Sequence, residues 1–62
     1  MGQGAAARRR ETLDYMQTLL RQMRVMAERE RCGMLAYYIE MAVLEVGDLL
    51  KAESASVERI KQ

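Results

Sequence analysis

The sequence predicts an all-α fold made of one antiparallel helical hairpin, and three observations lead to it. The 62 residues include no proline and are rich in methionine, leucine, alanine, glutamate and arginine, which favour helix. Apolar residues recur at spacings of three and four on both sides of Gly33. The chain has no third segment large enough to cover both stripes. We therefore expect the hairpin to self-associate as a homodimeric four-helix bundle.

The first helix is expected over about residues 12–31. Thr12 is a suitable N-cap, and Asp14 would place a negative charge in the first turn, where the helix dipole favours it. One arc of this helix is apolar and the opposite side is polar, as in an ordinary amphipathic helix. The apolar arc consists of Leu13, Met16, Leu19, Leu20, Met23, Met26 and Ala27.

Gly33 marks the expected turn. It follows the last charged turn of the first helix and is predicted to be a C-cap glycine in the left-handed conformation. Because Met34 begins another apolar period at once, the connection must be short, which makes the two helices antiparallel neighbours. The alternative is a single long helix through Gly33, at a cost of about 1 kcal/mol relative to alanine.

The second helix, expected over about residues 34–52, is apolar on most of its circumference. Helices of this kind are normally buried on most sides, and one partner helix cannot bury all of them. Gly47 is interpreted as a small residue that permits close approach of a neighbouring helix, with a hinge as the alternative. The residues expected at the oligomer or partner interface are Met34, Tyr37, Tyr38, Ile39, Met41, Leu44 and Val46.

The segments outside the hairpin, which spans residues 12–53, are expected to be less regular. Residues 1–11 are predicted to be a flexible tail, because Gly2 and Gly4 disfavour regular structure. Three arginines in that tail would also oppose the dipole at a helix N-terminus. Residues 54–62 are predicted to form a short C-terminal turn or a frayed tail.

The residues needed for catalysis are few. The chain contains no histidine, and no glycine-rich phosphate loop is present, so we predict no enzyme activity, no cofactor and no metal. Cys32 is the one candidate reactive thiol, because helix N-termini favour thiolates and two arginines are near in sequence. It could also form an intersubunit disulfide. The alternative is a small, inert residue packed at the turn.

The arginines raise a second function class, a nucleic-acid-binding helical dimer. Its contacts would come from Arg8, Arg9, Arg10, Arg21 and Arg24. We favour a solvated tail with surface ion pairs, including a one-turn pair between Arg24 and Glu28. The formal net charge is only +1, and no aromatic residue lies among these arginines to stack a base.

The location and partners follow from the same composition. The longest uncharged run, residues 32–39, is far shorter than the roughly 20 apolar residues of a membrane-spanning helix, so we expect no membrane association. A single unpaired thiol suits the reducing cytoplasm. The expected partners are a second copy of the chain and an unidentified protein that docks along Tyr37, Met41 and Leu44. The overall prediction is a small cytosolic interaction protein, in the regulatory or subunit class.

Four short motifs resemble those of a group of uncharacterised small bacterial two-helix proteins. They lie at residues 26–30, 35–37, 39–42 and 47–48, and read Met-Ala-Glu-Arg-Glu, Leu-Ala-Tyr, Ile-Glu-Met-Ala and Gly-Asp. The resemblance covers roughly residues 12–52 and implies a helical hairpin without a known activity. The architecture also resembles that of the plasmid RNA-binding hairpin dimers, which are four-helix bundles of this size.

Overall fold

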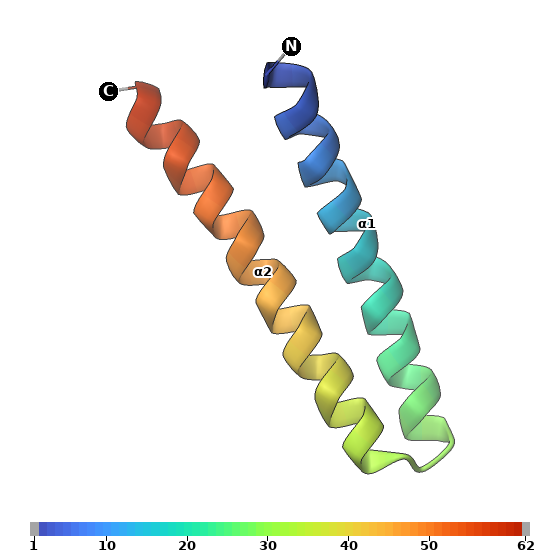
Figure 1. Cartoon of the computed structure of the whole chain (residues 1–62). Helices are drawn as coiled ribbons and strands as arrows, with labels where there is room; N and C mark the ends of the chain where they lie inside the picture. The colour runs from blue at the N-terminus through green and yellow to red at the C-terminus, as the bar shows by residue number, and fades with distance from the viewer. Residues whose placement is uncertain (1, 62) are drawn as a thin grey trace.

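The protein is a hairpin of two long antiparallel α-helices. The structure, a computed structural model, describes residues 2–61, with side chains at residue 4 and from residue 7 to residue 53. Helix α1 spans Gly2–Arg29 and helix α2 spans Gly33–Lys61, so that both ends of the chain lie at the end opposite the turn (Figure 1). The all-α class and the two-helix hairpin are confirmed.

Both helices are longer than predicted. Helix α1 begins at Gly2 rather than near residue 12, and α2 continues to Lys61 rather than ending near residue 52. The prediction gave too much weight to the glycines and to the dipole. Alanine and arginine have high helix propensity, and no proline interrupts either end. The Nε atom of Arg9 lies 3.5 Å from Oε1 of Glu53, so an ion pair joins the helices in the first of these extensions.

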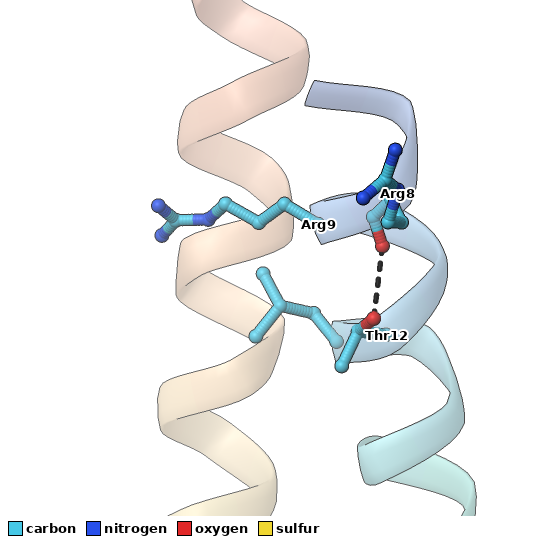
Figure 2. Close-up of a pocket in the computed structure, with 4 residues that line it drawn as sticks. Arg8, Arg9 and Thr12 are labelled. Atoms are coloured by element: carbon cyan, nitrogen blue, oxygen red, sulfur yellow. Dashed lines mark hydrogen bonds between the residues drawn. The ribbon is translucent and has the colours of Figure 1, made fainter. Parts of the chain in front are cut away.

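The predicted N-cap at Thr12 is wrong, because Thr12 lies inside α1. Its hydroxyl donates a hydrogen bond of 2.9 Å to the carbonyl oxygen of Arg8, one turn earlier (Figure 2). Thr18 donates in the same way to the carbonyl oxygen of Asp14, at 3.3 Å. Threonine hydroxyls inside a helix commonly bond to the preceding turn in this manner.

Arg31, and not Gly33, adopts the left-handed conformation at the turn, with φ of 60°. The amide of Cys32 donates to the carbonyl of Ala27 at 2.9 Å, and the amide of Arg31 donates to that of Glu28 at 3.0 Å. These two bonds form a Schellman motif with Arg31 at the position glycine usually occupies. Gly33 instead begins α2. The predicted C-cap was therefore two residues too late, because these local backbone hydrogen bonds end α1 before Gly33.

Small and β-branched side chains line the interface between the two helices, which we call the seam. Among residues 7–53, five hydrophobic residues are buried: Ala27, Ala36, Ile39, Val43 and Val46. Ala27, Ala36 and Ile39 form one cluster near the turn, with Leu20 packed against it. No side chain in the described part of the chain is fully buried. The seam alone is a thin core.

Two polar residues of α1 also lie at the seam. The amide nitrogen of the Gln17 side chain donates to the carbonyl oxygen of Val43 at 3.4 Å. A Cβ atom added at Gly47 would lie 3.3 Å from the same nitrogen, which supports the interpretation that Gly47 permits close approach. Arg24 is the second such residue, and it is half-buried.

Candidate interaction surfaces

The hairpin leaves most of its large apolar side chains exposed. Twelve large hydrophobic residues of the described chain are exposed, compared with five residues in the buried core. Ten of the twelve fall into the three rows described below, and the other two are Tyr15 and Val25. A chain this small normally supplements its core by association or by cross-links, so these rows are the candidate functional surfaces.

One exposed row runs along α1. Its members follow the spacing three, four, three, which places them on a single side of the helix. The row consists of Met16, Leu19, Met23 and Met26, with exposed fractions from 39% to 59%. The predicted apolar arc of this helix therefore divides in two: Leu13, Leu20 and Ala27 face the seam, and this second row lies about 100° around the helix.

A second row runs along α2 and consists of Leu35, Tyr38, Ala42 and Leu49, with the exposed Glu45 at its edge. Leu35 and Tyr38 are 53% and 61% exposed, whereas Ala42 and Leu49 are half-buried. At 100° per residue, this row is offset from the seam by nearly the same angle, and in the same sense, as the row on α1. A two-fold rotation about an axis perpendicular to the plane of the two helices exchanges antiparallel helices and leaves each broad side of the hairpin facing the same way. Both rows thus lie on one broad face of the hairpin, which we call the apolar face.

A third row, the outer line, lies on the side of α2 that points away from α1. It consists of Met34, Tyr37, Met41 and Leu44, all of which are exposed. The rings of Tyr37 and Tyr38 contact each other edge to face, with centroids 5.7 Å apart, and join the outer line to the apolar face.

Two of the predicted interface residues do not lie on any exposed surface. Ile39 and Val46 are only 7% and 5% exposed, because they pack in the seam against α1. The broad apolar arc of α2 contained both a seam row and a surface row. The prediction that these two residues lie at an interface was wrong. The α1 row was not predicted as a surface, although the polar residues Gln17 and Arg24 already break the continuity of the seam row.

The predicted arginine cluster is only partly available for phosphate contacts. Arg24 lies 3.4 Å from Glu40 Oε1 through Nε and 3.6 Å from Glu28 Oε2 through Nη1, so the predicted pair with Glu28 is confirmed. Arg9 is paired with Glu53. Successive residues point about 100° apart on a helix, so Arg8, Arg9 and Arg10 do not share a face. Near the open end of the hairpin, Arg8, Arg9, Thr12 and Leu13 line a shallow hollow (Figure 2).

Cys32 lies in the turn, immediately before α2, with an exposed thiol. Its Sγ atom lies 3.6 Å from the carbonyl oxygen of Glu30, to which the thiol donates. The turn therefore presents the thiol to solvent rather than packing it against a helix. Whether it reacts or cross-links stays a prediction.

Metal-binding clusters and membrane-spanning stretches are absent from the described part of the chain. Among those residues, no three cysteine, aspartate or glutamate side chains come close enough together to hold a metal ion. Over the same residues, neither helix contains an apolar stretch that could cross a membrane. The main feature of the described residues is that a thin seam occurs together with three exposed apolar rows.

The comparisons with known proteins add no relative. No protein-family model, curated protein or solved structure matches the chain. The fold and its surfaces define the molecule as a two-helix hairpin with an uncovered apolar face.

Proposed function

We propose that the chain is a small helical interaction protein that acts by self-association, as a homodimeric four-helix bundle without catalysis of its own. The observation that carries this proposal is the imbalance, within the described part of the chain, between twelve exposed large hydrophobic residues and a buried core of five. Apolar surface of this extent on one small chain is typical of protein interfaces. A two-layer bundle would bury the apolar faces of both hairpins against each other.

The dimensions of the hairpin fit this proposal. The hairpin measures 47 by 19 by 10 Å along its principal axes, so its broad side has a projected area of about 900 Å² (47 × 19). Stable protein interfaces bury roughly 800 Å² on each partner. The rows of the apolar face span residues 16–26 and 35–49, about 15–21 Å of that length at 1.5 Å per residue. They would therefore form the apolar part of an interface that extends over the broad side.

The outer line supports a second element of the proposal, a protein partner besides the chain itself. A dimer formed through the apolar faces leaves Met34, Tyr37, Met41 and Leu44 on the edge of the bundle. Methionine-rich surfaces adapt to partners of different shape. We place the protein in the cytosol, because its single cysteine has no second cysteine in the chain with which to pair.

Sedimentation equilibrium and thermal unfolding test the proposal directly. We expect twice the chain mass of 7.1 kDa at micromolar concentration. We also expect a thermal midpoint that rises with protein concentration, because association stabilises the folded state by mass action. A folded species at the mass of one chain, with a midpoint independent of concentration, would contradict self-association.

A further inference from the structure

We infer that the apolar face pairs with the apolar face of a second copy in one particular arrangement: α1 of each chain packs over α2 of the other, and both turns lie at the same end. This inference rests on the proposed self-association and specifies its geometry. Two hairpins that stack face to face with a two-fold axis can pair in two ways. Either each α1 covers the partner's α2, or like helices cover like helices and the turns lie at opposite ends.

The positions of the two rows along the length of the hairpin help to distinguish the two pairing arrangements. Residues joined across the seam have numbers that total 60 to 64, as in Gln17 with Val43, Arg24 with Glu40, and Arg9 with Glu53. Residue 42 therefore lies near the level of residues 18–22. The α1 row is centred at that level, between Leu19 and Met23, and the one small residue of the α2 row, Ala42, lies there too.

Side-chain size favours the arrangement in which α1 of each chain packs on α2 of the other. In that arrangement Ala42 of one copy lies opposite the space between Leu19 and Met23 of the other, so that small faces large on both sides of the bundle. Pairing like helices about an axis at the level of Ala42 would instead place Leu19 against Met23 on one side and two alanines against each other on the other side. Well-packed layers alternate large and small residues across facing positions, and unequal layers leave voids or clashes.

Charge favours the same arrangement. Helix α1 carries six arginines and three acidic residues, a net charge of +3, whereas α2 carries three basic and five acidic residues, a net charge of −2. Placing α1 over α2 brings opposite net charges together along both edges of the bundle. Like-helix pairing would place the two basic helices side by side, and like charges at an interface are unfavourable.

The native cysteine provides the test. Cys32 is the only cysteine, and its thiol is exposed in the turn, so a nitroxide spin label can be attached without any substitution. We expect a label separation of about 10–25 Å by pulsed electron spin resonance, as set by helix spacings of 8–10 Å. A separation near the 47 Å length of the hairpin would overturn the arrangement and leave self-association intact. The absence of any dimer by sedimentation would overturn both.

A matched pair of substitutions tests the face itself. Met23, on the apolar face, and Val25, on the opposite side of α1, have similar exposed fractions of 48% and 40%. We expect Met23→Glu to raise the dimer dissociation constant at least roughly 100-fold, because it buries an unpaired charge. Val25→Glu should change it less than about threefold, as expected of a surface substitution. Equal effects of the two substitutions on the dimer dissociation constant would contradict the assignment of Met23 to the dimer interface. The label distance in the unsubstituted protein decides the arrangement even if Met23→Glu unfolds the chain.

Discussion

Arg24 of α1 and Glu40 of α2 form an ion pair across the seam, with Nε and Oε1 3.4 Å apart. The pair lies between the cluster at Ala27 and the hydrogen bond from Gln17, so it is one of several polar contacts along the seam. Its side chains are 37% and 42% exposed, which means that water and salt screen it. We therefore expect it to contribute little to the stability of the hairpin.

Removing this pair should therefore have a small and salt-dependent effect. We expect Arg24→Gln to lower the free energy of unfolding by about 0.5–1 kcal/mol at low salt and by less at 1 M salt. Urea unfolding of this variant, of Glu40→Gln and of the double variant would give the coupling energy. Arg21→Gln, an exposed substitution on the same helix, is the control. A coupling energy that does not fall with salt would contradict the screened ion pair.

The left-handed conformation of Arg31 predicts that glycine is better at this position. Non-glycine residues pay about 1–2 kcal/mol in this region of backbone space. We expect Arg31→Gly to raise the free energy of unfolding by about 1 kcal/mol, measured by urea unfolding at fixed protein concentration. Arg29→Gly, at the last residue of α1, should be destabilising instead. If both variants were destabilised, the Schellman turn would be placed incorrectly.

Gly33 is expected to respond in the opposite way. It is the first residue of α2, it lacks a positive φ, and a Cβ atom added there would meet nothing within 4 Å. Gly33→Ala should stabilise the protein by about 0.4–1 kcal/mol, mainly by restricting the unfolded chain. The thermal midpoint would rise accordingly. If Gly33 were instead the left-handed C-cap residue, the substitution would lower the thermal midpoint. The sign of the change therefore distinguishes a turn with a left-handed Gly33 from one with a left-handed Arg31.

The seam and the outer line should differ sharply in their sensitivity to truncation. Ile39 is 7% exposed in the seam, whereas Met34 is 65% exposed on the outer line. We expect Ile39→Ala to cost about 2–4 kcal/mol, because it removes buried surface and leaves a cavity. Met34→Ala should change the free energy of unfolding by less than about 0.5 kcal/mol. Similar losses in the two variants would mean that the outer line is buried in the folded assembly.

The sequence by itself determined the all-α class, the antiparallel hairpin and the position of the turn to within two residues. Those properties follow from helix propensity, the absence of proline and the spacing of apolar residues, all of which are local. The ends of the helices were harder to predict. The ion pair between Arg9 and Glu53 joins residues that are far apart in the chain.

Only the tertiary structure decided which apolar row faces inward. Each helix carries an apolar arc wide enough for two rows, and periodicity cannot say which row contacts the other helix. Ala27, Ala36 and Ile39 pack together in the seam, where the two alanines allow the helices to approach closely. This packing leaves Met23 and its neighbours exposed and buries Ile39 and Val46. The structure also shows that Arg31, instead of Gly33, is the left-handed residue.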